Sequence, residues 1–206
     1  PDKHDPYGGA DDNPSGVAAQ LEIARALSAD RARLERDVLF LAFSGEETGL
    51  VGSSHFTRQR GGAGMKEISA MLNLDMVGRL RTTGLLVLGA ESAAEWGPHI
   101  AAACEEARVG CSPSGDGYGP SDHSPFYASG VPVLHFFTGA HSDYHKPTDV
   151  PGSVNAAGTA QVARLVSTLV QGLGEKATLT YRQVPSPTPR GDMRSFNASL
   201  GTVPDY

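Results

Sequence analysis

An apolar run that ends abruptly in two acidic residues constrains the fold of this chain more than any other feature. Residues 38–43 read Val-Leu-Phe-Leu-Ala-Phe, which is typical of a strand buried on both faces of a sheet. The run is followed by Ser44-Gly45-Glu46-Glu47. Open α/β sheets bind ligands in the crevice at the carboxyl ends of their strands. Glu46 and Glu47 repel each other unless a metal ion or a shared proton intervenes, although an isolated acidic pair is more often a solvated turn.

The rest of the chain alternates between apolar runs and helical patterns. Buried strands are also predicted over residues 68–76, 85–88 and 131–137, and helices over residues 17–29, 98–107 and 156–173. Residues 112–120 are rich in Gly, Ser and Pro and are predicted to form a loop. The alternation predicts an α/β fold, a three-layer sandwich in which helices flank a mixed, largely parallel central sheet.

Composition limits the classes of partner. The 206 residues carry a formal net charge of −6, and because there is no basic stripe we expect no nucleic acid partner. No apolar run approaches the ~20 residues that cross a bilayer, so no membrane span is predicted. Cys104 and Cys111 lie seven positions apart and could close a small loop in an oxidising compartment. Two cysteines are no disulfide framework, and we expect two free, partly buried thiols.

Acids or imidazole occur in four places in otherwise apolar surroundings: at Asp11-Asp12, Glu46-Glu47, Asp75 and His145. Ligands spread this widely are normal where a sheet brings strand ends together, unlike the close spacing of zinc fingers. Carboxylate and imidazole without thiolate favour zinc, cobalt or manganese. A carboxylate that bridges two ions would give a two-metal site, and an unliganded carboxylate beside it would act as a general base.

Each of these residues also has a structural explanation when taken alone. Asp11 and Asp12 could as readily be Asx-turn and helix-capping residues as residues of a site. Asp75 could end a strand beside a backbone donor, and His145 is one of seven histidines. The tripeptide Ser121-Asp122-His123 contains the residue types of a hydrolase triad, but consecutive side chains do not point at one another as a triad requires.

Five stretches in order resemble the bacterial leucyl aminopeptidase type of co-catalytic zinc exopeptidase, metallopeptidase family twenty-eight. They are GADDNPSG (9–16), AFSGEETGLVGS (42–53), LNLDMVG (72–78), SDHSPFY (121–127) and YHKPTD (144–149). Any one of them is a weak signal, but five in the family's order are highly specific. The resemblance covers the chain from about residue 8 to about residue 173.

The resemblance implies a role for each acid and for the histidine. Asp12 matches the ligand that bridges both metals, and the further metal ligands fall on Glu47, Asp75 and His145. Glu46 matches the general base. Tyr144 and Tyr118 occupy positions that relatives use to steady the oxyanion. Zinc is the implied cofactor, with two ions in the intact enzyme, and the implied partners are the N-termini of peptides or proteins.

One departure from the family pattern concerns the second metal. The pattern begins with a His-x-Asp motif that supplies a ligand, whereas this chain has only His4-Asp5 upstream of Asp12, with the wrong spacing. We expect the motif to have been cut off with the N-terminus. Asp12, Glu47 and His145 would then form one three-ligand site with an open position, and the other site would keep only Asp12 and Asp75. We therefore expect weak binding of a second ion and a nearly inactive chain.

The resemblance implies a truncated zinc peptidase catalytic domain over residues 1–180. Residues 181–206 read as a linker that resembles the lead-in to a PDZ domain, with a plain disordered terminus as the alternative. The implied function is a metal-dependent aminopeptidase in which Glu46 activates the attacking water. The alternatives are a glutaminyl cyclase-like zinc enzyme, a carboxypeptidase or dipeptidase of the same clan, and a non-catalytic binding domain of the same fold. An extracytoplasmic or secreted location is favoured by the resemblance alone.

Overall fold

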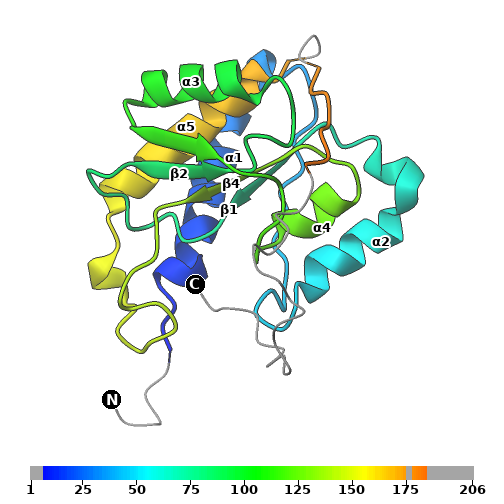
Figure 1. Cartoon of the computed structure of the whole chain (residues 1–206). Helices are drawn as coiled ribbons and strands as arrows, with labels where there is room; N and C mark the ends of the chain where they lie inside the picture. The colour runs from blue at the N-terminus through cyan, green and yellow to red at the C-terminus, as the bar shows by residue number, and fades with distance from the viewer. Residues whose placement is uncertain (1–6, 175–177, 185–206) are drawn as a thin grey trace, which may run out of the picture.

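A mixed sheet forms the middle layer of the protein in a computed structural model that describes residues 7–174 and 178–184 (Figure 1). Its strands within those ranges are β1 (Met71–Leu74), β2 (Leu85–Leu88), β3 (Cys111–Ser114) and β4 (Val133–Phe137), in the order β1-β4-β2-β3. Strand β4 pairs parallel with β1 and antiparallel with β2, and β2 pairs parallel with β3. Because two of these three pairings are parallel, the predicted mixed, largely parallel sheet is confirmed.

Helices cover both faces of the sheet, as predicted (Figure 1). Helices α1 (Gly16–Ala29), α3 (Trp96–Ala107) and α5 (Ala156–Gly172) pack together on one face, and α2 (Val51–Met65) and α4 (His123–Ala128) lie on the other. Short helical turns are η1 (Asp11–Ser15), η2 (Arg31–Arg33) and η3 (Pro151–Ser153). None of the helices in the described part of the chain combines the length and the apolarity that a bilayer span requires.

Each helix layer buries its own apolar cluster against the sheet. In the larger one Trp96, Leu134 and Leu165 are fully buried, and in the smaller one Phe126 and Tyr127 are. Helix α5 shows why the local sequence folds this way. Asn155 caps it by accepting a hydrogen bond from the N–H of Gly158 at 2.9 Å, and its buried residues recur at helical spacing.

The predicted buried strand over residues 38–43 is wrong. These residues are extended but belong to no strand, and Leu39 and Phe40 are 61% and 39% exposed. The segment runs beside α1, where the side chain of Gln20 donates to the carbonyl of Leu41 at 2.8 Å. Val38 packs against the larger core cluster. Leu41 and Phe43 pack against the smaller one. Within the described ranges no strand pairs with the segment, which leaves Leu39 and Phe40 exposed.

The predicted loop over residues 112–120 begins instead with strand β3. The strand pairs only with β2 and lies at the edge of the sheet. Pro113 lacks the N–H that a central strand needs, but an edge position tolerates it. A proline-rich composition therefore hid a strand that the sheet can accommodate.

The expectation of free thiols at Cys104 and Cys111 is also wrong, because the two form a disulfide. Helix α3 ends at Ala107, and Arg108 takes the left-handed conformation with φ of 55°. The chain thereby turns back into β3, which brings the two Cα atoms to 6.2 Å. That separation is within the range that a disulfide spans.

Residues 178–184 return to the domain and are bonded to it. The backbone of Arg182 donates to the carbonyl of Ser92 at 2.8 Å, and the hydroxyl of the buried Tyr127 donates to the carbonyl of Arg182 at 3.0 Å. The predicted domain boundary at residue 180 stays a prediction. The linker predicted beyond Val184 and the residue His4 lie outside the described residues.

We expect removal of the disulfide to destabilise the protein. Substituting Cys104→Ser together with Cys111→Ser frees a loop whose ends are seven residues apart, which should cost about 2–3 kcal/mol of unfolding free energy by loop-closure entropy. Urea unfolding with and without reductant measures this loss of unfolding free energy. The wild type should shift on reduction and the double variant should not, whereas a wild-type midpoint that ignores reductant would contradict the pairing.

Candidate metal centre

Asp12 lies at the carboxyl end of β1, because its turn is hydrogen-bonded to the end of that strand. It lies in η1 but has non-helical angles, φ −107° and ψ 93°. The side chain of Asn13 donates to the carbonyl of Leu74 at 2.9 Å and accepts from the N–H of Met76 at 3.1 Å. These bonds fasten the turn to the strand end, so Asp12 reaches the crevice where ligands are expected.

Glu46 and Glu47 lie in the turn that leads into α2. The carbonyl of Glu46 accepts from the N–H groups of Gly49 and Leu50 at 3.0 and 2.8 Å. Gly45 has a φ of 70°, a left-handed conformation that favours glycine. The turn therefore keeps its two carboxylates at one end of the sheet, although the segment before it is no strand.

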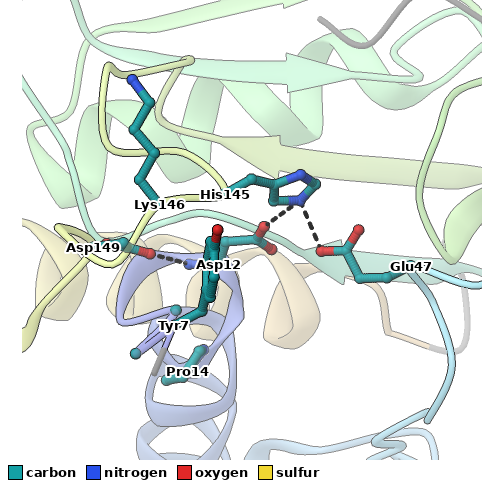
Figure 2. Close-up of a pocket in the computed structure, with 9 residues that line it drawn as sticks. Tyr7, Asp12, Pro14, Glu47, His145, Lys146 and Asp149 are labelled. Atoms are coloured by element: carbon teal, nitrogen blue, oxygen red, sulfur yellow. Dashed lines mark hydrogen bonds and ion pairs between the residues drawn. The ribbon is translucent and has the colours of Figure 1, made fainter. Parts of the chain in front are cut away.

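His145 comes from the loop that follows β4 and meets both acids. Its Nε2 atom lies 2.9 Å from Glu47 Oε1 and 3.2 Å from Asp12 Oδ2, as Figure 2 shows. One ligand atom from each of these three residues lies within 4.8 Å of the other two. They line a pocket of about 600 Å³ together with Tyr7, Gly8, Gly9, Pro14, Lys146 and Asp149. Among the described residues, this is the one group of acids and imidazole with such geometry.

Excess negative charge shapes the electrostatics of this pocket. Burial, together with the charges of Asp75 and Glu47, raises the pKa of Glu46 to about 7. Burial and the same two neighbours also raise the pKa of Asp12, which His145 opposes. Carboxylates this close hold protons when no cation is present, because ionising all of them costs Coulomb energy. A divalent cation would remove that cost, and two carboxylates with one imidazole are a donor set that fits zinc.

Asp75 lies near the group but not in it. It follows β1, and its Oδ2 atom accepts a hydrogen bond from the hydroxyl of Ser121 at 2.6 Å, which in turn accepts from Asn73 at 2.8 Å. Its charge raises the pKa of both Asp12 and Glu46, so it faces the same crevice. Of the four predicted metal ligands, the structure brings three into contact, and the role of Asp75 stays a prediction.

The two predicted oxyanion tyrosines differ in position. Tyr144 stacks on the ring of His145, with centroids 3.8 Å apart. Tyr118 packs edge-on against Tyr127, with centroids 4.8 Å apart. Neither tyrosine is among the residues that line the pocket, and only Tyr144 contacts a proposed ligand. His123 is buried next to His135, and burial lowers the pKa of both imidazoles, which fits a structural place beside the site.

Asp149 is a residue of this centre that sequence reasoning missed. It is 1% exposed, and its Oδ2 atom accepts from the N–H groups of Asp11 at 2.9 Å and Asp12 at 3.1 Å. It stands in the stretch YHKPTD, four positions after His145. The sequence shows that an acid stands at this position. It does not show that this acid contacts Asp12 and Asp11, which lie 137 and 138 positions earlier in the chain.

Comparison with known proteins adds relatives of this site. The chain is 32% identical over 173 residues to the aminopeptidase YwaD of Bacillus subtilis (strain 168), covering 79% of this chain and 37% of the relative. It is 35% identical over 142 residues to the leupeptin-inactivating enzyme 1 of Streptomyces exfoliatus, covering 67% and 30%. The chain thus spans about a third of the length of these two curated relatives.

Solved structures share the fold. An aminopeptidase from Aneurinibacillus sp. strain AM-1 superposes with a TM-score of 0.71 at 28% identity, over 86% of this chain and 43% of that one. A zinc aminopeptidase of Bacillus subtilis gives a TM-score of 0.70 at 28% identity, over 84% and 43%. A glutaminyl cyclase from an Acidobacteriales bacterium, at 19% identity and a TM-score of 0.60, has the same fold.

The sequence model of one peptidase family matches most of the chain, from residue 2 to residue 170. That range contains every residue of the acid and histidine group described above. The resemblance that the five motifs indicate is thereby confirmed. The chain belongs to peptidase family M28.

Proposed function

We propose that this chain forms the metal-binding core of an aminopeptidase that removes residues from the N-termini of peptides. The observation that carries the proposal is the meeting of Asp12, Glu47 and His145 within 4.8 Å of one another, with the carboxyl group of Glu46 beside them. The names of the relatives, which include aminopeptidases and a zinc aminopeptidase, support it.

Asp12, Glu47 and His145 would hold the first zinc ion. When bound, the ion supplies Lewis acidity, which lowers the pKa of water and polarises a peptide carbonyl. Asp75 would belong to a second site that shares Asp12, since its charge acts on Asp12 while its oxygens lie outside the first group. With Asp12 and Asp75 as its only proposed ligands among the described residues, that second site would lack a ligand.

Glu46 would act as the general base. Glu46 directly precedes the proposed ligand Glu47 but does not belong to the group formed by Asp12, Glu47 and His145. Its carboxylate would therefore not be occupied by the metal and could accept a proton. Burial raises its pKa above the ordinary value, which suits a group that first accepts the proton of the attacking water and then donates it to the leaving amine. Tyr144, stacked on His145, would stand beside the carbonyl oxygen as it gains negative charge.

The charge of the pocket suits an N-terminal substrate. Asp12, Glu46, Glu47 and Asp75 act on one another electrostatically in or beside the crevice, and the protonated α-amino group of a peptide is the cation that every substrate of an aminopeptidase carries.

Exchange of Glu46 should separate catalysis from metal binding. Glu46→Gln removes the base. In a longer protein that supplies the missing second-site ligand, it should lower leucyl-anilide cleavage by about 10²- to 10⁴-fold with zinc content unchanged. The matched change Glu47→Gln removes a proposed ligand and should lower zinc content itself. Zinc analysis and an anilide assay measure both. Loss of zinc from the Glu46 variant would show that its role is misassigned.

The same preparation separates the rival functions. Ring closure of an N-terminal glutaminyl peptide without anilide cleavage would establish the cyclase alternative. If zinc binds but neither reaction occurs, and a longer protein that supplies the missing ligand is also inactive, the result would favour a non-catalytic binding domain.

The stability of the metal-free protein should depend on Glu46 with a definite sign. Because its folded pKa is about 7 against an ordinary 4.5, the native state holds this proton more tightly than the unfolded state. The unfolding free energy should therefore fall as pH rises from about 4.5 to about 7 and then level off. Calorimetry in chelator should show a shallower fall in melting temperature for Glu46→Gln than for the wild type. Glu106→Gln, at an exposed position of α3, is the matched control, and three superimposable profiles would refute the shift.

A further inference from the structure

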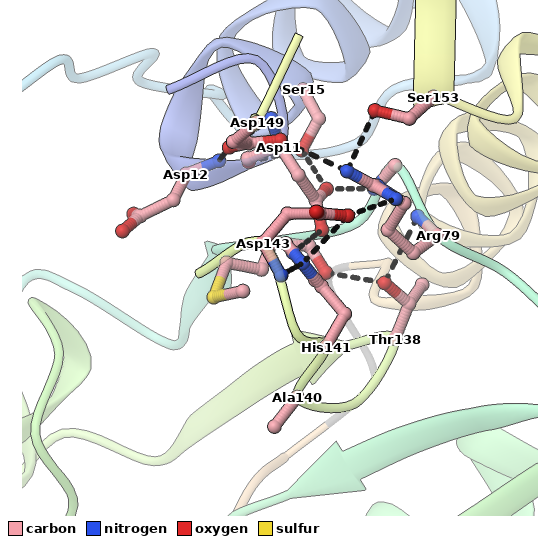
Figure 3. Close-up of polar contacts among 12 residues, drawn as sticks. Asp11, Asp12, Ser15, Arg79, Thr138, Ala140, His141, Asp143, Asp149 and Ser153 are labelled. Carbon is pink, nitrogen blue, oxygen red and sulfur yellow. Dashed lines mark hydrogen bonds and ion pairs between the residues drawn. The ribbon is translucent and has the colours of Figure 1, made fainter. Parts of the chain in front are cut away.

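A buried polar network lies behind the candidate metal centre and ends on the turn that carries Asp12 (Figure 3). Both carboxylate oxygens of Asp149 are engaged in it. Oδ2 accepts from the backbone N–H groups of Asp11 and Asp12, and Oδ1 lies 3.1 Å from a guanidinium nitrogen of Arg79. A carboxylate this deeply buried needs such a partner, because an unpaired buried charge is costly.

Arg79 is itself held in place on several sides. Its guanidinium donates to Ser153 at 2.8 Å and to Asp143 at 3.2 Å, and its backbone N–H donates to the hydroxyl of Thr138 at 3.1 Å. Its side chain is only 11% exposed. The cation therefore cannot follow Asp149 if that residue moves, and it fixes the carboxylate from the side opposite to the metal centre.

The other side of the turn is held through Asp11. Its Oδ1 atom accepts from the N–H of Gly78 at 2.6 Å and from the hydroxyl of Ser15 at 2.9 Å, and its Oδ2 atom lies 3.0 Å from Nε2 of His141. A Cβ atom at Gly78 would come within 2.7 Å of the Asp11 carboxylate, so only glycine leaves room for this contact. Asp12 thus extends into the pocket from a turn with little freedom.

Asp149 also links two of the loops that supply the candidate ligands. Its N–H donates to the carbonyl of Lys146 at 3.0 Å, which ties it to the loop of His145. Its own carbonyl accepts from the N–H of Ala10 at 3.1 Å, in addition to the two bonds from Asp11 and Asp12. One residue therefore sets the position of the Asp12 turn relative to the loop of His145.

We propose that Asp149, locked by Arg79, is a positioning residue for the metal centre: it sets the separation of the Asp12 carboxylate and the His145 imidazole. The proposal rests on the proposed function, since it assumes that these two groups share an ion. Outer residues that orient metal ligands typically change metal affinity by about 10- to 100-fold when they are exchanged.

The test compares two changes with the same chemistry around the same cation. Asp149→Asn weakens the acceptor of the Asp11 and Asp12 N–H groups and turns an amide towards Arg79. Asp143→Asn removes the other acidic partner of Arg79. Among the described residues Asp143 makes no direct hydrogen bond to the Asp12 turn; its carboxylate otherwise accepts from the hydroxyl of Thr148 at 2.8 Å and lies 3.9 Å from Nδ1 of His141. Arg79 keeps its contacts with Asp149 and Ser153 in that control.

Zinc affinity is measured by competition with a chromophoric chelator, and the visible spectrum of bound Co²⁺ reports the geometry of the ligands. We expect about 10- to 100-fold weaker zinc binding and an altered cobalt spectrum for Asp149→Asn, and at most about a 3-fold change with a wild-type spectrum for Asp143→Asn. Circular dichroism checks that each variant is folded. If Asp149→Asn does not fold, Arg79→Lys is the second variant. It keeps the positive charge but loses the two guanidinium nitrogens that bind Asp149, Asp143 and Ser153, and it should still weaken zinc binding more than Asp143→Asn does.

The outcomes separate this inference from the proposed function. A wild-type chain that binds no zinc would overturn both. Wild-type binding with an equally tight, spectrally unchanged Asp149→Asn would overturn the positioning role alone, as would an equal loss in both Asn variants, which would point to charge balance instead of position.

Discussion

Mutual repulsion among carboxylates at one end of the sheet is the constraint on which the rest of this structure depends. Asp12, Glu46, Glu47 and Asp75 come from separate parts of the chain, and burial together with their proximity raises the pKa of Asp12 and Glu46. Folding alone gives no reason to gather charges that destabilise one another. A cation that binds the native state supplies that reason, because its binding energy is added to the stability of the folded chain.

The architecture explains how separate segments converge. Strands β1 and β4 run parallel and side by side, so the residues that follow them lie at the same edge of the sheet. The Asp12 turn is bonded to the end of β1, and the loop after β4 carries His145 back across it. Asp149 closes this arrangement from behind. The pocket is therefore a consequence of strand direction and of a few hydrogen bonds between loops, and both helix layers serve mainly to bury the sheet.

The sequence predicted those parts of the fold and site that depend on local pattern. The helical periodicity of α5 and the acid and histidine motifs are visible along the chain, and three of the four predicted ligands meet in space. Residues 38–43 were misjudged because an apolar run does not show whether anything covers it. The disulfide depends on the left-handed turn at Arg108, and the contacts of Asp149 join residues more than 130 positions apart. Neither follows from local composition.

The proposed function requires Asp12, Glu47 and His145 to share one metal ion. A crystal structure of the chain grown with zinc, with diffraction data collected on both sides of the zinc absorption edge, tests this directly. We predict one strong anomalous peak about 2 Å from a carboxylate oxygen of Asp12, a carboxylate oxygen of Glu47 and Nε2 of His145. Zinc bound elsewhere on a chain whose three side chains keep these positions would contradict the account.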